Sequence, residues 1–79
     1  MSWNTLHPTI QTTAQNVLTP KQLEAWKLEL AGYGTRRIAE HLSISRASTI
    51  DRLDSAYRRL LAAGIRQDAS GHYHQETAA

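Results

Sequence analysis

Residues 35–61 read TRRIAEHLSISRASTIDRLDSAYRRLL, and this stretch decides the fold. The pattern predicts a short helix over 35–42, a tight turn, and a longer helix that starts after Ser45. Ala39 is small enough to let the second helix cross close to the first, and Ile44 supplies an apolar plug in the turn. Ser45 can cap the second helix, because its hydroxyl can accept from an unpaired backbone N–H in the first turn. The sequence therefore predicts two crossing helices, with the outer face of the second left free.

Two further helices are predicted before this stretch. The first begins at Pro8, because proline suits the first position of a helix. Its apolar residues recur at spacings of four and three: Leu6, Ile10, Ala14 and Val17. The second begins at Pro20, where Thr19 and Gln22 have the spacing of a capping box. Its buried stripe comprises Leu23, Trp26, Leu30 and Tyr33, and its end is marked by Gly32 and Gly34.

The helix that follows Ser45 has a predicted apolar face centred on Leu53. A period of 3.6 residues places five more residues within about 80° of it: Ile50, Ala56, Tyr57, Leu60 and Leu61. The opposite side carries Ser48, Asp51, Ser55 and Arg58, with Arg52 and Arg59 on one flank. Gly64 is a natural end for this helix.

The C-terminal residues allow two interpretations. Asp68-Ala69-Ser70-Gly71 suits a type I turn, and extended arms on either side would form a short β-hairpin, or wing. The alternative is a polar tail, because an isolated hairpin is only marginally stable in water. Residues 1–7 are predicted as a flexible lead-in and residues 75–79 as disordered. We therefore expect an all-α, three- to four-helix bundle with a helix-turn-helix domain over residues 8–64. Residues 65–79 would then comprise the hairpin, where it forms, and a disordered tail.

Composition limits the classes of protein to which the chain can belong. Seventy-nine residues allow one small domain with a marginal core, so a second copy or a ligand can add to its stability. The chain has no cysteine, which excludes disulfides and thiolate metal sites. Its apolar runs are too short to cross a bilayer and no signal-peptide pattern is present. We therefore expect a soluble cytoplasmic protein.

Positive charge is concentrated in one part of the sequence. The net charge is only +2, and residues 1–34 are balanced. Residues 35–59 carry more arginines than carboxylates: Arg36, Arg37, Arg46, Arg52, Arg58 and Arg59 against Glu40, Asp51 and Asp54. Guanidinium groups suit phosphate oxygens and the edges of guanine. The alternative is solvated surface charge, but the concentration of arginine on the two crossing helices favours a nucleic-acid surface.

An ordered set of short motifs runs through residues 18–61: Leu18-Thr19-Pro20-Lys21-Gln22, Ala31-Gly32, Ile38-Ala39-Glu40, Leu42, Ile44-Ser45, Arg52-Leu53, Ala56 and Arg58-Arg59-Leu60. This set resembles the fourth conserved region of bacterial sigma factors and the related C-terminal domains of response and quorum-sensing regulators. The resemblance implies an all-helical domain that reads promoter DNA with its last long helix and, in sigma factors, contacts RNA polymerase. It also implies a groove-facing side made of Arg46, Ala47, Ser48, Asp51, Arg52 and Ser55.

The chain departs from this family at one position in the reading helix. The family places a β-branched apolar residue four before the leucine that matches Leu53, whereas this chain has Thr49 there and Ile50 next to it. The helix can therefore be turned by one residue, which would change the bases that it contacts. No segment matches the sigma-factor region that melts DNA, so we expect a stand-alone reading domain of phage or bacterial origin.

The predicted function is sequence-specific binding of double-stranded DNA by a small transcriptional regulator. Phosphate contacts are assigned to Arg36, Arg37, Arg58 and Arg59. The helix that begins at Thr35 can hold a further phosphate through its backbone N–H groups. Base-edge contacts are assigned to Arg46, Ser48, Asp51, Arg52 and Ser55. One copy covers little DNA, so we expect a homodimer or a partner on adjacent DNA.

Two other functions remain open on the sequence. A protein-interaction module of the same fold would bind RNA polymerase or a phage packaging partner, since Asp51 and Asp54 on the groove side repel phosphate. The chain could also be the DNA-binding head of a small packaging-terminase subunit. An enzyme is not expected, because His41 stands alone in the predicted centre, without a nucleophile or orienting group. No metal or cofactor is expected either: His72 and His74 lack further ligands and no glycine-rich phosphate loop is present.

Overall fold

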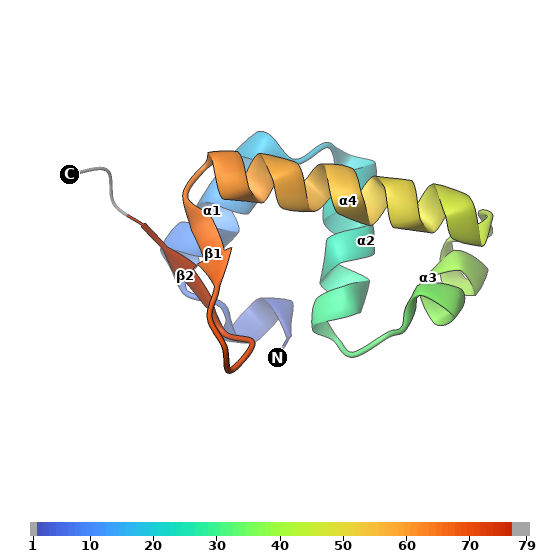
Figure 1. The fold of residues 1–79 in the computed structure, drawn as a ribbon, viewed down its shortest axis with the longest axis horizontal. Coiled ribbons are helices and arrows are strands. Elements are labelled where there is room, and N and C mark those ends of the chain that lie inside the picture. Colours follow the sequence, from blue (N-terminus) through green and yellow to red (C-terminus); the bar gives the residue numbers. More distant parts are fainter. Residues whose placement is uncertain (1, 77–79) are drawn as a thin grey trace.

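Four α-helices and one antiparallel hairpin make up residues 2–76, which are the residues that the computed structural model describes (Figure 1). The elements in chain order are a 3₁₀ turn η1 (Trp3–Thr5), α1 (Pro8–Val17), α2 (Pro20–Leu30), α3 (Thr35–Leu42), α4 (Arg46–Ala62), β1 (Ile65–Gln67) and β2 (Tyr73–Gln75). The prediction of a mostly helical fold is confirmed, and of the two interpretations of the C-terminal residues the hairpin is the one present. None of these helices combines the length and the apolar character that a membrane crossing requires.

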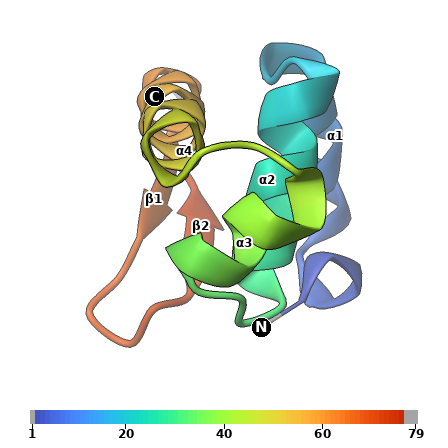
Figure 2. The same ribbon diagram turned by 90° about the vertical axis from the view of Figure 1, so that its right-hand side faces the viewer.

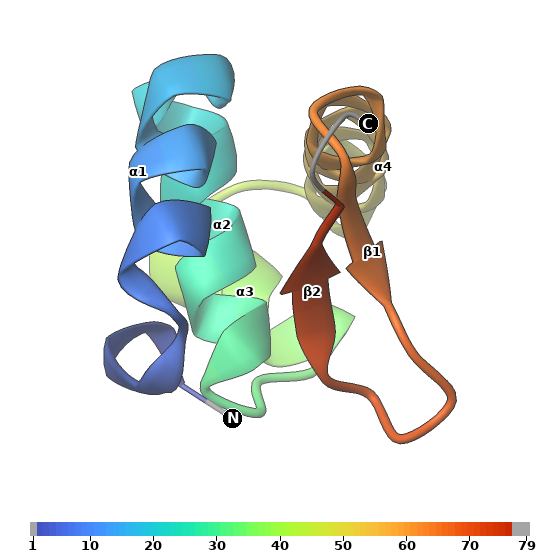
Figure 3. The same ribbon diagram turned by 90° about the vertical axis from the view of Figure 1, so that its left-hand side faces the viewer.

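The longest helix, α4, lies across α2, with α3 near its N-terminal end and the hairpin at its C-terminal end (Figure 1). Seen along α4, the hairpin lies on the same side of the molecule as α4, and α1 lies on the opposite side (Figure 2). The chain leaves the end of α4 and enters β1 directly, while η1 lies at the foot of α1 (Figure 3). The elements from both ends of the sequence therefore meet beneath the C-terminal half of α4.

The helix boundaries follow the capping signals in the sequence. Thr19 Oγ1 accepts from the backbone N–H of Gln22 at 3.2 Å, and Gln22 Oε1 accepts from the N–H of Thr19 at 3.1 Å. Ser45 Oγ accepts from the backbone N–H of Ser48 at 3.0 Å at the start of α4. Both predicted caps are confirmed, because each side chain satisfies a backbone donor that has no partner within its helix.

The turn between α3 and α4 contains Ser43, Ile44 and Ser45. Ser43 has a left-handed backbone conformation, with φ of 56°, which reverses the chain after α3. The N–H of Ile44 donates to the carbonyl of Ala39 at 3.0 Å and so satisfies one carbonyl at the end of α3. The side chain of Ile44 is only half-buried, so it contributes less to the packing between α3 and α4 than the sequence predicts.

Buried side chains form two clusters, and α4 contributes to both. The larger cluster contains Leu6, Ile10, Ala14, Leu18, Trp26, Leu30, Ala56, Leu60 and Ile65. The smaller cluster contains Ala25, Ile38 and Leu53, with Leu28, Tyr33 and Leu42 packed against it. In α2 the predicted stripe is confirmed at Trp26 and Leu30, whereas Leu23 is only half-buried and the buried Ala25 was not predicted.

The buried face of α4 is rotated relative to the predicted one. Its buried residues are Thr49, Leu53, Ala56 and Leu60. Three residues predicted on the apolar face are exposed instead: Ile50 (50%), Tyr57 (37%) and Leu61 (53%). Ala56 and Leu60 lie in the same cluster as the fully buried Trp26, and Leu53 lies in the smaller cluster. The side of α4 that faces the core therefore runs through Thr49 and Leu53 rather than through Ile50 and Tyr57.

Thr49 occupies a buried position in which its hydroxyl is satisfied locally. Its side chain is fully buried, and its Oγ1 donates to the backbone carbonyl of Ser45 at 3.1 Å. A buried hydroxyl with a partner avoids the desolvation cost of an unpaired polar group. Thr49 therefore fills the core position at which the family that the sequence resembles has an apolar residue, and Ile50 is exposed.

The N-terminal segment packs onto the core over residues 2–6, whereas the sequence predicts a flexible lead-in over residues 1–7. Leu6 is 5% exposed and belongs to the larger cluster. The indole of Trp3 meets that of Trp26 edge to face at 6.1 Å between ring centroids. Gln11 Nε2 donates to the carbonyl of Trp3 at 2.8 Å. The segment is ordered because it covers the apolar surface of Trp26.

The C-terminal hairpin forms, so the polar-tail alternative is wrong for residues 65–76. Ile65 pairs with Gln75 and Gln67 pairs with Tyr73 in an antiparallel register. Ile65 is 3% exposed, and the ring of Tyr73 meets Trp26 edge to face at 5.4 Å. These apolar contacts provide the stability that an isolated hairpin lacks. Gln75, predicted as disordered, ends β2, and residues 77–79 lie outside the described part of the chain.

Asp68 organises the turn of the hairpin. Its Oδ1 accepts from the N–H groups of Ser70 at 2.9 Å and His72 at 3.0 Å, and its carbonyl accepts from the N–H of Gly71 at 3.0 Å. Its Oδ2 lies 2.6 Å from Nε2 of His74. The hydrogen bond with His74 and those with the backbone lower the pKa of Asp68 from 3.8 to about 2.

At the junction of α4 and β1, Gly64 has φ of 86°. A Cβ at this position would lie 2.9 Å from the carbonyl oxygen of Glu76. Glycine therefore suits both the backbone conformation and the close approach of the strand.

Leu53→Ala should destabilise the fold by about 2–5 kcal/mol, because it leaves a cavity beneath α4. Leu61→Ala is the matched control on the same helix and should change stability by less than about 0.5 kcal/mol, because Leu61 is 53% exposed. Thermal or urea unfolding measures both. Equal losses in the two variants would contradict the observed rotation of α4.

Acidification should weaken the hairpin through Asp68. Because its pKa in the fold is below the ordinary value, the carboxylate stabilises the fold above about pH 4, and this contribution is lost as the pH falls towards 2. NMR titration of the Asp68 carboxyl carbon measures the pKa. His74→Ala should raise it towards 3.8, whereas His72→Ala should leave it unchanged, because His72 contributes only its backbone N–H and carbonyl. An unaltered pKa in His74→Ala would refute the assigned cause.

Candidate nucleic-acid interface

The surface of α4 divides into three exposed strips around its buried face. The outer face, opposite the buried residues, carries Ala47, Asp51, Ser55 and Arg58. One flank, here called the basic flank, carries Ser48, Arg52 and Arg59. The other, here called the apolar flank, carries Ile50, Tyr57 and Leu61. Arg46 is exposed at the first position of the helix.

The structure separates the residues predicted to read bases by their exposure. Arg46, Ala47, Ser48 and Asp51 are exposed in the first turns of α4, whereas Arg52 and Ser55 are half-buried. Ser48 accepts a hydrogen bond from the hydroxyl of Ser45 at 2.9 Å, which leaves its own hydroxyl proton available to a ligand. In the N-terminal half of α4, polar residues therefore occupy the outer face and the basic flank, while Arg46 projects on the side of Ile50.

The arginines differ in the salt bridges that their guanidinium groups form. No carboxylate of the described residues forms a salt bridge with Arg46 or Arg52. Arg58 Nη2 lies 2.8 Å from Asp54 Oδ2, and Arg36 Nε lies 3.6 Å from Glu40 Oε1. Both pairs are exposed pairs within one helix, which contribute little to stability and are easily exchanged for another anion. Arg46 therefore combines exposure with the absence of a carboxylate partner among these residues, whereas Arg52 likewise lacks such a partner but is half-buried.

Two further predicted phosphate-binding residues have contacts within the fold. Arg37 stacks over the ring of Tyr33, with 4.3 Å between its guanidinium carbon and the ring centroid. Arg59 Nη1 donates to the carbonyl of Val17 at 3.1 Å. Val17 is the last residue of α1, so Arg59 satisfies a helix-terminal carbonyl, a role that sequence analysis missed. The remaining N–H groups of Arg59 are exposed and can still donate to a phosphate.

The N-terminus of α3 has free backbone donors. Gly34 is the N-cap residue, and no side chain at this position accepts from the first N–H groups of α3. Thr35 is half-buried and begins the helix, followed by the exposed Arg36 and Arg37. Backbone donors beside guanidinium groups favour an anion. The structure thus brings together the predicted phosphate-binding elements of α3.

The acidic residues near this surface are unevenly neutralised. Asp54 is paired with Arg58, whereas Asp51 is exposed on the outer face and forms no salt bridge with a described cation.

The arginines of α4 are far apart. Arg58 follows Arg46 by 12 residues, which is about 18 Å along the helix. The charged groups therefore spread along the whole of α4 rather than forming a compact patch.

The hairpin adds little free positive charge. Arg66 Nε lies 2.7 Å from Glu76 Oε1, and His74 is bonded to Asp68. Within residues 2–76, no group of three or more histidine, aspartate or glutamate side chains is arranged to hold a metal ion. The hairpin is therefore present, but Arg66 and His74 are already paired with carboxylates of the same segment.

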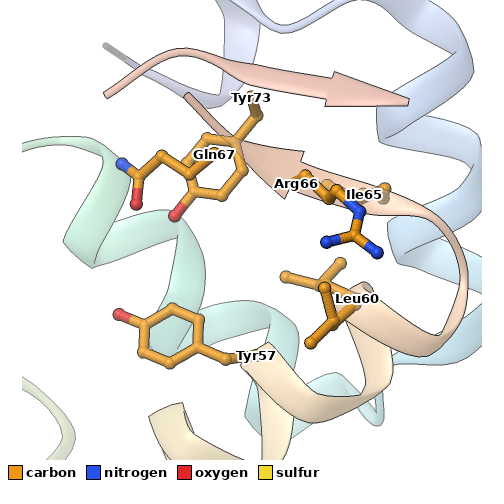
Figure 4. A pocket seen from close by; sticks show the side chains of 7 residues that line it. Tyr57, Leu60, Ile65, Arg66, Gln67 and Tyr73 are labelled. Carbon is orange, nitrogen blue, oxygen red and sulfur yellow. The ribbon is translucent and has the colours of Figure 1, made fainter. Parts of the chain in front are cut away.

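A hollow of about 300 Å³ lies between the C-terminal half of α4 and the hairpin (Figure 4). Its lining consists of Tyr57, Leu60, Leu61, Ile65, Arg66, Gln67 and Tyr73. The Tyr57 hydroxyl donates to the carboxylate of Glu29, and burial together with this bond raises the pKa of Tyr57. Because Tyr57 and Leu61 belong to both, the hollow continues the apolar flank of α4.

The sequence did not predict this hollow, because its walls come from α4 and from strands that the sequence left open.

No protein-family model, curated protein or solved structure matches this chain. Its function is therefore inferred from its own residues and their arrangement.

Proposed function

We propose that this protein binds double-stranded DNA in a sequence-specific manner, with α3, the turn and α4 acting as a helix-turn-helix. The observation that carries the proposal is the orientation of the N-terminal half of α4. Thr49 and Leu53 anchor this half to the core, while Arg46 and Arg52 remain without a carboxylate partner. An α-helix fits the major groove, and an unpaired guanidinium can donate to O6 and N7 of guanine.

In this proposal the two ends of the surface hold the DNA backbone. Arg36 and Arg37, with the free N–H groups at Thr35, would contact one stretch of phosphates, and Arg58 and Arg59 another. The polar residues between them would contact base edges: Ser48, Asp51, Arg52 and Ser55. The resemblance to sigma-factor region 4 supports a role in transcription, for a stand-alone regulator of phage or bacterial origin. A homodimer would double the small DNA surface that one copy covers.

Binding to random duplex DNA should be steeply salt-dependent. The logarithm of the affinity should fall by about 0.9 for each neutralised phosphate per unit of log salt, which predicts a slope of roughly −3 to −6 per protomer. Fluorescence anisotropy with a labelled duplex between low and moderate salt measures this slope. A protein that binds no duplex at low salt, or binds equally well at all salt concentrations, would contradict the proposal.

Two arginine variants should separate base reading from phosphate binding. Arg52→Ala should lose about 1–3 kcal/mol on a site selected from random duplexes and less on random DNA. Arg37→Ala should weaken binding to all sequences equally and reduce the salt slope by about one. Thermal unfolding controls for lost packing of the half-buried Arg52. If both variants lose affinity without regard to sequence, α4 is not the reading helix.

The apolar flank favours a second candidate function, a protein-interaction module. Ile50, Tyr57 and Leu61 are exposed along one side of α4, and the adjoining hollow could receive a side chain of a partner such as an RNA polymerase subunit. In that case the fold would be used for protein binding, and DNA contact would be secondary or absent. This candidate is favoured if the salt titration detects no duplex binding.

A further inference from the structure

Ile50 is an exposed apolar side chain on the part of α4 proposed to enter the major groove. It is 50% exposed and belongs to neither buried cluster. The core position beside it is filled by Thr49, so Ile50 is not needed for packing. An aliphatic side chain in this place gains from water exclusion only when a ligand covers it.

The surroundings of Ile50 restrict what that ligand can be. Arg46 precedes it by one helical turn, so the two side chains project from neighbouring points on the same side of α4. One helical turn advances about 5.4 Å, and stacked base pairs are about 3.4 Å apart. Side chains one turn apart therefore face base pairs that are one or two steps apart.

We propose that Ile50 reads the 5-methyl group of a thymine, within one or two base pairs of a guanine that Arg46 contacts. This inference rests on the proposed DNA-binding function and assigns a specificity determinant to it. The thymine methyl is the apolar group that unmodified base pairs display in the major groove, so it is the base feature complementary to an isoleucine. The neighbouring Ala47 is small and exposed, which leaves the approach to Ile50 open.

Tyr57 and Leu61 continue the apolar flank but are poorly placed for the same task. Tyr57 lies seven residues beyond Ile50, or about 10 Å along α4, and its hydroxyl is held by Glu29. Leu61 lies beside the hollow under the C-terminal half of the helix. Leu61→Ala therefore serves as the control for loss of an exposed aliphatic side chain from the same helix.

The test replaces single thymines by deoxyuridine, which removes only the methyl group. A high-affinity duplex is first selected from random sequences with the wild-type chain. Each thymine of this duplex is then replaced in turn, and dissociation constants are measured for the wild type, Ile50→Ala and Leu61→Ala. At one position the replacement should weaken wild-type binding about fourfold, the loss expected for one methyl group no longer buried.

Ile50→Ala should bind the thymine and deoxyuridine duplexes equally, whereas Leu61→Ala should retain the wild-type ratio. Replacing a guanine one or two base pairs from that thymine by 7-deazaguanine, which lacks N7, should weaken the wild type and leave Arg46→Ala unaffected. Melting temperatures close to that of the wild type confirm that the variants fold.

The wild type could bind its selected duplex tightly and yet bind the thymine and deoxyuridine versions equally at every position. That result would overturn this inference and leave the proposed function intact. An undiminished ratio in Ile50→Ala would do the same. A wild-type chain that binds no duplex would remove the proposed function and this inference together. A guanine read by Arg46 more than two base pairs away would refute the assigned spacing.

Discussion

The buried face of α4 is the constraint on which the rest of the structure depends. Leu53 lies in one buried cluster, while Ala56 and Leu60 lie in the other. Because a single helix bridges both clusters, it cannot rotate about its axis without disturbing packing at two places. The same rotation determines which side chains of the N-terminal half reach the solvent. The candidate interface is therefore set by core packing as much as by the distribution of charge.

Trp26 explains why the two ends of the chain are ordered. Its fully buried indole receives the edge of Trp3 from the N-terminal segment and the edge of Tyr73 from β2. A turn of three residues or a pair of three-residue strands cannot be stable alone. Each becomes stable by burying apolar area against a large ring that α2 holds in place. A tertiary contact of this kind leaves no signal in the local sequence, so both ends were mispredicted or left open.

The helix boundaries were predictable because capping is local. Thr19 with Gln22, and Ser45 with Ser48, act within four residues of chain. The rotation of α4 was not predictable in the same way, because both of its sides offer a plausible core. Hydrophobicity favours Ile50, Tyr57 and Leu61, but the side of α4 that packs against the rest of the fold carries Thr49 and Ala56.

The sequence also predicted part of the candidate site. Helical spacing placed Ser48 and Asp51 opposite the predicted core, and both are exposed. It assigned Ile50 to the core, where the structure has Thr49. It also missed the bond between Arg59 and Val17, since the two residues are 42 positions apart and their approach depends on how α1 packs beneath α4.

Carboxylates among the arginines are consistent with selective rather than tight binding under the proposed function. Asp51 would repel every phosphate that approaches α4, whatever the base sequence, and Asp54 offsets the charge of Arg58, so both would lower the affinity for random duplex. Base contacts made by Arg46 or Ile50 depend on sequence and are less affected by this background. What a regulator needs is a high ratio of specific to non-specific affinity, because competing sites are abundant. Under the proposed function, a net charge of only +2 would limit the general attraction of this small domain to DNA, and the side chains that the rotation of α4 exposes would then determine that ratio.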